Sequence, residues 1–168
     1  MKINIKFLKL ITKKKTQISD NDKEKVLKLK NSHYEYSMSL QREWYAKNLN
    51  TRDLQNLLFY KKELVGYNCL RFIKYNTSQL ILFDTLVIKK KYRRKSLSTL
   101  ILEKSNLIIK KKNKIGILFC LKEMIPFYEK NKWKKLKKKY LTSSKDSQKE
   151  LYPMIFNYKK IIRFKISI

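Results

Sequence analysis

The hydrophobic pattern along the chain changes repeatedly between the two-residue repeat of strands and the longer repeat of helices. Strands are predicted where apolar residues alternate with polar ones or form short uninterrupted runs. They cover residues 1–10, 57–60, 64–72, 80–88, 115–121, 133–140 and 153–164. Helices are predicted where apolar residues recur every three or four positions. They cover residues 23–30, 40–47, 96–111 and 122–131.

The order of these elements predicts an α/β domain built on a mixed sheet. Residues 57–60 and 64–72 flank a short charged turn and predict a hairpin, in which Gly66 marks a bulge or a close backbone approach. Strand 80–88, helix 96–111 and strand 115–121 predict a parallel pair with a right-handed crossover.

Length and composition indicate one globular domain over residues 1–168. At 43% hydrophobic residues the chain is too apolar for a disordered polycation. Its first residues lack the continuous apolar core of a signal peptide, and no stretch is long enough for a membrane span. Cys69 and Cys120 form no disulfide-like framework, which suits a reducing compartment. We therefore expect a cytoplasmic protein without an integral membrane segment; attachment to anionic lipid stays open.

The net charge of +29 predicts attraction to anionic partners. Only six of the 42 basic residues are arginine, the residue that makes bidentate phosphate and base contacts. This scarcity favours a solvated basic surface over a dedicated nucleic-acid face. RNA or another polyanion stays open as a partner.

Two segments carry recognisable motifs. Residues 88–98, I-K-K-K-Y-R-R-K-S-L-S, join a predicted strand to a predicted helix, and residues 126–133, P-F-Y-E-K-N-K-W, begin in the last predicted helix. The first resembles the acyl-CoA loop, and the second the element on the last helix, of the GNAT (Gcn5-related) acyl-CoA N-acyltransferases. The resemblance implies the GNAT fold, which is a mixed, mostly antiparallel sheet with a central parallel β-α-β pair and helices on both faces.

The resemblance also implies a site for acetyl-CoA, the acyl donor. The first turn of a helix exposes unpaired N–H groups that bind a pyrophosphate. By resemblance the residues at this turn are Arg93, Arg94, Lys95, Ser96, Leu97, Ser98 and Thr99. The strand end Leu86, Val87 and Ile88 would present backbone groups to the pantetheine.

Serines replace both glycines of the family loop, at Ser96 and Ser98. A Cβ at Ser96 crowds the phosphate or opposes a positive φ. Its hydroxyl could instead donate to the phosphate, and a plain helix cap is the alternative. The asparagine that many family members carry after the second parallel strand is absent from residues 121–123, so one pantetheine contact is lost or replaced.

Two residues are candidates for proton transfer. Tyr128 matches the family tyrosine that protonates the leaving thiolate, and its alternative is a packed aromatic. Asp84, the only acid in its strand, could take a proton from the amine directly or through water, or could pair with a lysine. We interpret His33 as a surface residue and Cys120 as a buried hydrophobe, and expect no metal.

The function that follows from the resemblance is direct transfer of an acetyl or short acyl group from acyl-CoA to a primary amine. The acceptor would be a small molecule or a protein, selected by the first two helices and the final strands. Trp44 and Tyr45 in the second helix are interpreted as core residues. The alternative is a GNAT scaffold that has lost catalysis and binds RNA or a nucleoprotein through its lysines.

Overall fold

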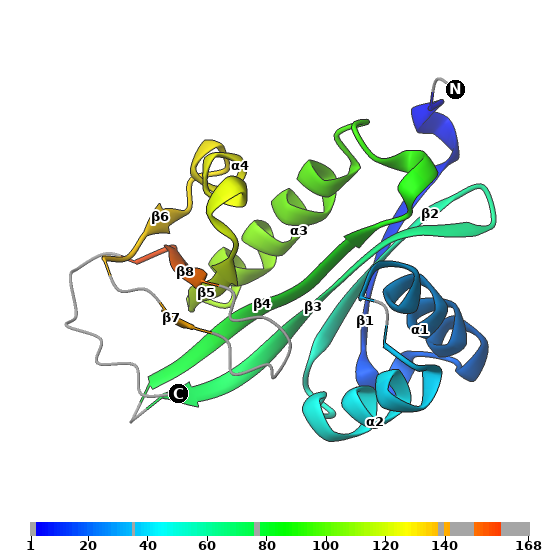
Figure 1. The fold of residues 1–168 in the computed structure, drawn as a ribbon, viewed down its shortest axis with the longest axis horizontal. Helices are drawn as coiled ribbons and strands as arrows, with labels where there is room; N and C mark the ends of the chain where they lie inside the picture. The colour runs from blue at the N-terminus through cyan, green and yellow to red at the C-terminus, as the bar shows by residue number, and fades with distance from the viewer. Residues whose placement is uncertain (1–2, 35, 76–77, 138–139, 142–149, 159–168) are drawn as a thin grey trace. The chain divides into compact units, whose positions relative to one another are not determined.

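The computed structural model describes residues 3–34, 36–75, 78–137, 140–141 and 150–158 (Figure 1). The helices are α1 (Asp20–Tyr34), α2 (Met38–Asn48), α3 (Leu97–Lys111) and α4 (Ile125–Lys130). The strands are β1 (Leu8–Lys14), β2 (Leu54–Tyr60), β3 (Glu63–Tyr75), β4 (Ser78–Ile88), β5 (Ile115–Cys120), β6 (Lys134–Lys135), β7 (Tyr140–Leu141) and β8 (Glu150–Phe156). Short 3₁₀ helices cover Ile5–Phe7, Lys15–Gln17, Lys90–Tyr92 and Lys122–Met124.

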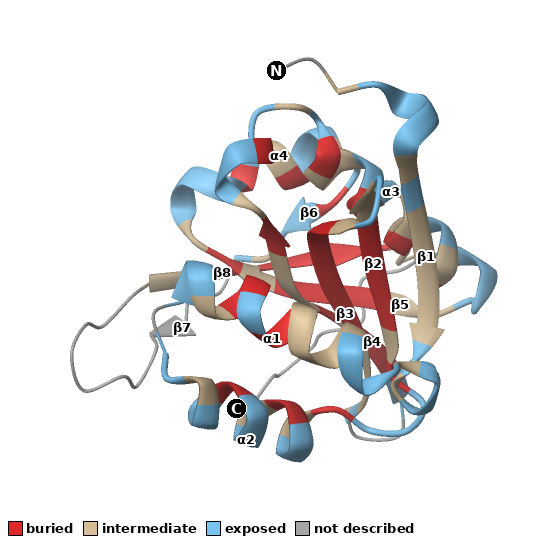
Figure 2. Ribbon diagram, turned by 90° about the vertical axis from the view of Figure 1, so that its right-hand side faces the viewer, coloured by how far each residue is buried: buried red, intermediate tan, exposed pale blue. Residues whose placement is uncertain are grey.

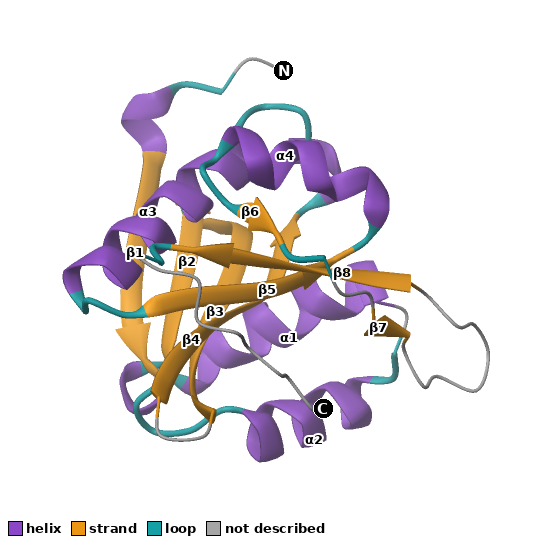
Figure 3. Ribbon diagram, turned by 90° about the vertical axis from the view of Figure 1, so that its left-hand side faces the viewer, coloured by secondary structure: helices purple, strands orange, loops and turns teal. Residues whose placement is uncertain are grey.

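The strands pair in the order β1-β2-β3-β4-β5-β8-β6, with β7 on β8. β4 and β5 are parallel, with Leu80–Leu82 opposite Ile115–Ile117, whereas β1–β2, β2–β3, β5–β8 and β6–β8 are antiparallel (Figure 3). The predicted mixed, mostly antiparallel sheet with one parallel pair is confirmed. The chain divides into two compact units, Met1–Phe72 with Phe83–Ser105 and Ile73–Leu82 with Asn106–Ile168. That residues 1–168 form one domain stays a prediction.

In the first unit, helices cover both faces of the sheet because the strand residues alternate between two apolar clusters (Figure 2). Leu57 belongs to the cluster that contains Leu27 of α1 and Tyr45 of α2. The next residue, Leu58, belongs to the cluster that contains Ile101 of α3. The burial of these side chains removes apolar surface from water, and this is the main source of stability.

A buried polar network joins β2, β3 and α3. Asn56 donates from Nδ2 to Asn68 Oδ1 (2.8 Å) and to Ser105 Oγ (3.0 Å), and its Oδ1 accepts from the Thr12 hydroxyl (2.6 Å). Asn56, Asn68 and Ser105 are fully buried. Because each has partners, burial of these polar groups is offset by hydrogen bonding.

Both glycines lie where another backbone or side chain approaches closely. The β2–β3 register shifts between Leu58 and Phe59, opposite Gly66, so the predicted bulge is confirmed. A Cβ on Gly66 would lie 2.8 Å from Ile101 Cδ1. In the second unit a Cβ on Gly116 would lie 3.0 Å from Cη2 of Trp133, whose ring stacks on Phe156 in β8 (5.3 Å between centroids).

Two predicted strands were wrong in extent. The first begins at Leu8 rather than residue 1, because the Asn4 side chain accepts from the Lys6 N–H (3.0 Å) and starts a 3₁₀ turn. Residues 133–140 do not form one continuous strand: Lys134–Lys135 pair with β8 as β6 and Tyr140 pairs with it as part of β7, since the lysine-rich run supplies no apolar face. β8 covers Glu150–Phe156, and residues 142–149 and 159–164 of the predicted loop and strand lie outside the described residues.

The other predicted elements are present, with shifted ends. The first helix extends to Tyr34, and the Ser19 hydroxyl accepts from the Asp22 N–H at its start (3.2 Å), as an N-cap does. Pro126 lies in the first turn of α4, where its missing N–H is tolerated. No helix within the described ranges is both long and apolar enough to cross a bilayer.

We expect Asn56→Ala to lower the free energy of unfolding by about 2–3 kcal/mol, because it leaves buried partners of Asn56 without their hydrogen bonds. Ser105→Ala is the matched control and should cost about 1 kcal/mol, because Asn56 and Asn68 keep their mutual bond. Urea unfolding of both variants measures the difference. Equal losses would show that Asn56 is not the centre of the network.

Candidate functional site

The segment between β4 and α3 is fastened to the start of β3 by one carboxylate. Glu63 accepts hydrogen bonds from Lys89 Nζ (2.6 Å) and the Tyr92 hydroxyl (2.6 Å), and Lys91 Nζ lies 3.0 Å away. Partial burial acts to raise the pKa of Glu63, but these hydrogen bonds outweigh it and hold the pKa at about 2. The Glu63 contacts therefore fix the direction in which the chain leaves β4.

Arg93 ties the same segment to α1. Its Nε donates to the Ile88 carbonyl (3.1 Å), and its Nη2 lies 2.8 Å from His33 Nδ1. Burial and the charge of Arg93 both lower the pKa of His33, which favours the neutral ring that accepts this hydrogen bond. His33 is exposed, as predicted, but it also anchors the loop, a role that the sequence pattern did not indicate.

Ser96 adopts the backbone conformation that glycine usually supplies. Its φ is 56°, and the φ of Arg94 is 59°. The Leu100 N–H bonds to the Ser96 carbonyl (3.2 Å) and begins the 15-residue helix α3. In a helix that begins here, the N–H groups of Leu97, Ser98 and Thr99 have no partner within the helix, so they can bind an anion. The serine thus keeps the left-handed turn at some cost in strain.

A pocket of about 550 Å³ lies beside α1 and α2 and reaches the middle of β4. It is lined by Lys30, Tyr34, Tyr36, Leu40, Gln41, Glu43, Trp44, Lys47, Asn48, Asp84 and Thr85. The first two helices are expected from the sequence to help select the acceptor, and this pocket is lined by residues of the same two helices. Its volume is in the range of small-molecule sites.

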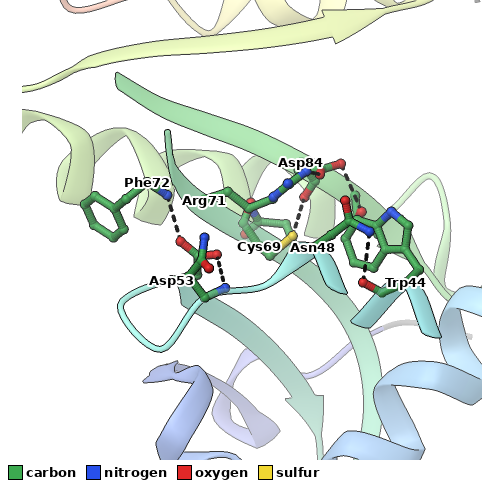
Figure 4. A network of polar contacts seen from close by, with 10 residues as sticks. Trp44, Asn48, Asp53, Cys69, Arg71, Phe72 and Asp84 are labelled. Carbon is green, nitrogen blue, oxygen red and sulfur yellow. Dashed lines mark hydrogen bonds and ion pairs between the residues drawn. The ribbon is translucent and has the colours of Figure 1, made fainter. Parts of the chain in front are cut away.

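Asp84 is held at this pocket by three contacts (Figure 4). Its Oδ2 lies 3.0 Å from Arg71 Nη1, its Oδ1 accepts from the Thr85 hydroxyl (3.1 Å), and its carbonyl accepts from Cys69 Sγ (3.5 Å). The ion pair is with an arginine of β3, not with a lysine. The carboxylate is therefore firmly placed, and it stays a candidate for the proton acceptor.

The loop between α2 and β2 is anchored to β3 by Asp53 (Figure 4). Asp53, which is fully buried, accepts from the N–H groups of Phe72 (2.7 Å) and Asn50 (2.7 Å). These bonds close the end of α2 against the sheet and so steady the helix that carries Trp44.

Lys30 and Trp44 are pocket residues that sequence reasoning missed. Lys30 is 3% exposed, and its Nζ lies 3.3 Å from the centroid of the Trp44 ring. Burial lowers the pKa of Lys30 to about 8. A signal was present: Lys30 follows Val26 by four positions, on the apolar stripe of α1. Tyr45 is a core residue, as predicted, and hydrogen-bonds to Gln55 (2.8 Å).

Tyr128 lies in α4 of the second unit and is largely buried. Its ring contacts Phe127 (5.1 Å between centroids) and Trp133 (6.3 Å), and its carbonyl accepts from the Trp133 N–H (3.1 Å). The motif at residues 126–133 therefore forms one packed aromatic group. Cys120 is buried, as predicted, and burial raises the pKa of its thiol to about 11. No cluster of His, Cys, Asp or Glu among the residues the structure describes could hold a metal ion.

Solved structures share this architecture at low sequence identity. ElaA of Escherichia coli superposes with a TM-score of 0.72 at 12% identity, over 88% of this chain and 98% of that one. An acyl-CoA N-acyltransferase of Pseudomonas aeruginosa gives a TM-score of 0.71 at 11% identity, over 88% and 98% of the two chains. An aminoglycoside 6′-N-acetyltransferase complexed with coenzyme A gives 0.69 at 14% identity, over 90% and 99%.

The chain has the GNAT fold. Neither a protein-family model nor a curated protein matches the sequence. Among described residues, the parallel pairing of β4 covers only Leu80–Leu82, although β4 continues to Ile88.

We expect Ser96→Gly to stabilise the protein by about 0.5 kcal/mol. Relief of left-handed strain gains about 1–2 kcal/mol, and the greater freedom of glycine in the unfolded chain removes about 0.5–1 kcal/mol of this. Ser98→Gly, two positions into the helical turn, should instead destabilise by about 0.5–1 kcal/mol. Thermal unfolding of both variants checks the opposite signs, and destabilisation by Ser96→Gly would contradict the strain.

Proposed function

We propose that the protein is an N-acyltransferase that moves an acetyl or short acyl group from acyl-CoA to a primary amine. The observation that carries the proposal is the left-handed turn at Ser96 before α3. It preserves, without glycine, a helix start at which backbone N–H groups can bind an anion. Acyl transfer is also the reaction named for two of the similar solved structures.

The residues of the loop fit the charge of acyl-CoA. The N–H groups of Leu97, Ser98 and Thr99 would bind the pyrophosphate, with the side chains of Arg94 and Lys95 adding positive charge. Arg93 would act indirectly, because its guanidinium already holds the loop to Ile88 and His33. The backbone of Leu86, Val87 and Ile88, on the part of β4 beyond its pairs with β5, would bind the pantetheine.

Transfer would proceed directly within a ternary complex. Backbone groups near Val87 would polarise the thioester carbonyl, and holding both substrates in place would supply most of the rate. Asp84, or a water bound to it, would take a proton from the ammonium of the acceptor. Tyr128 would protonate the thiolate that leaves, since a neutral phenol can donate at pH 7.

Release of free thiol from acetyl-CoA over a panel of primary amines tests this function. We expect turnover with at least one amine and a rise in melting temperature with acetyl-CoA alone. Tyr128→Phe should lower kcat by about 100-fold, because it removes the proton donor, while the melting shift with acetyl-CoA persists.

Tyr60→Phe is the matched control, because it removes a tyrosine hydroxyl of β2 that the proposed mechanism does not use. Its kcat should equal that of the wild type. The proposal fails if no amine releases thiol and acetyl-CoA does not raise the melting temperature.

A further inference from the structure

The pocket beside α1 and α2 holds one positive charge that makes no ion pair with a described carboxylate, although the charge of Asp84 acts on it from a longer distance. Glu43 pairs with Lys47 (2.6 Å), and Asp84 pairs with Arg71 (3.0 Å). Lys30 makes no ion pair with any carboxylate that the structure describes; its Nζ lies on the face of Trp44. A buried ammonium is costly unless an anion accompanies it.

A second observation points to an anion in the same place. Trp44 is flanked by two cations, because the Arg71 guanidinium carbon lies 5.8 Å from the ring centroid and Lys30 Nζ lies 3.3 Å from it. Only Asp84 is close enough to Arg71 to form an ion pair within the described residues. Moreover, Arg71 Nε is buried without a hydrogen-bond partner. The Trp44 surroundings thus carry two cations for one carboxylate.

The other walls of the pocket set the shape and polarity of the ligand. Tyr34, Tyr36, Leu40 and Trp44 give it an apolar, largely aromatic lining. A volume of about 550 Å³ suits a molecule of amino-acid to dipeptide size. A polycationic acceptor would place its charges against Lys30, which disfavours it.

We propose that the acceptor is an amine that also carries a carboxylate, such as an amino acid with an apolar or aromatic side chain, and that Lys30 binds this carboxylate. Asp84, which also lines the pocket, would then bind the ammonium group. The assignment of the pocket to the acceptor rests on the proposed function. The binding of a carboxylate beside Lys30 does not depend on the proposed function.

Three probes that differ only in their charged groups test the binding. They are L-phenylalanine, 3-phenylpropionate, which lacks the amine, and 2-phenylethylamine, which lacks the carboxylate. Titration followed by tryptophan fluorescence and by calorimetry should give dissociation constants for the two carboxylates that are about 10-fold or more below that of the amine. Equal or tighter binding of 2-phenylethylamine overturns the proposal.

Lys30→Met retains the length of the side chain and removes its charge. We expect this variant to lose the preference for the carboxylates. Lys28→Met, which changes an exposed lysine on the same helix, should keep it. Melting curves are the check that both variants fold, and a preference that survives Lys30→Met overturns the assignment of Lys30.

The pH dependence of 3-phenylpropionate binding gives an independent readout. Since the carboxylate binds the protonated amine and burial holds the pKa of Lys30 near 8, affinity should fall about 10-fold from pH 7 to pH 9. Burial raises the pKa of Tyr34 to about 12 and that of Cys69 further, so neither titrates in this window. The other charged groups facing the site are Arg71 of β3, Asp84 of β4, and Glu43 and Lys47 of α2.

Lys30→Arg keeps the charge at all these pH values and should give a flat profile. A flat profile in the wild type would overturn the role of Lys30. Turnover with acetyl-CoA separates the two proposals. If the protein binds carboxylates selectively but releases no thiol, the acyl-transfer proposal fails and the carboxylate site stands. If thiol release is faster with 2-phenylethylamine than with L-phenylalanine, acyl transfer stands and the proposed acceptor class fails.

Discussion

The left-handed backbone of Thr85 is the constraint on which the candidate acceptor pocket depends. Consecutive residues of a regular strand point to opposite faces, yet Asp84 and Thr85 both line the pocket. The φ of 56° at Thr85 accounts for this, and in a β-branched residue it costs about 1–3 kcal/mol. Contacts of Asp84 with Arg71, Cys69 and the Thr85 hydroxyl offset that strain. The strain is thus tied to the placement of the one carboxylate of β4.

The loop before α3 also contains a left-handed residue, Ser96, whose strain is offset by the contacts around it. A glycine would adopt the turn at residue 96 at little cost, whereas serine adopts it only because the surroundings hold it there. Glu63 on one side and the Arg93–His33 contact on the other supply those restraints. Acidic residues are few in this chain, 13 against 42 basic ones, so lysines compete for each carboxylate. Two of them, Lys89 and Lys91, meet at Glu63, where they define the loop.

The sequence was sufficient to predict the mixed sheet, its parallel pair and the helix that connects this pair, because hydrophobic periodicity reports on these directly. It could not predict Arg71 beside Asp84 or His33 beside Arg93, because these pairs are 13 and 60 residues apart and depend on strand register and helix packing. Trp44 was assigned to the core because an aromatic residue in a helix is ordinarily buried; it does pack against the core, but it also lines the pocket. The neighbouring Tyr45 does lie in the core, and only the rotation of α2 decides which of the two faces the pocket.

The position of Lys30 connects the stability of α1 with the chemistry of the pocket. A residue that follows Val26 by four and Leu27 by three positions lies on the buried stripe of the helix, where an apolar side chain would contribute more stability than a lysine. The aromatic face of Trp44 offsets only part of the cost of desolvating the ammonium. Asp84 also acts on this charge but is ion-paired with Arg71, and an anion bound in the pocket would recover more of the cost. A buried, unbalanced lysine in a pocket of ligand size is therefore better explained by what the pocket binds than by what holds the helix in place.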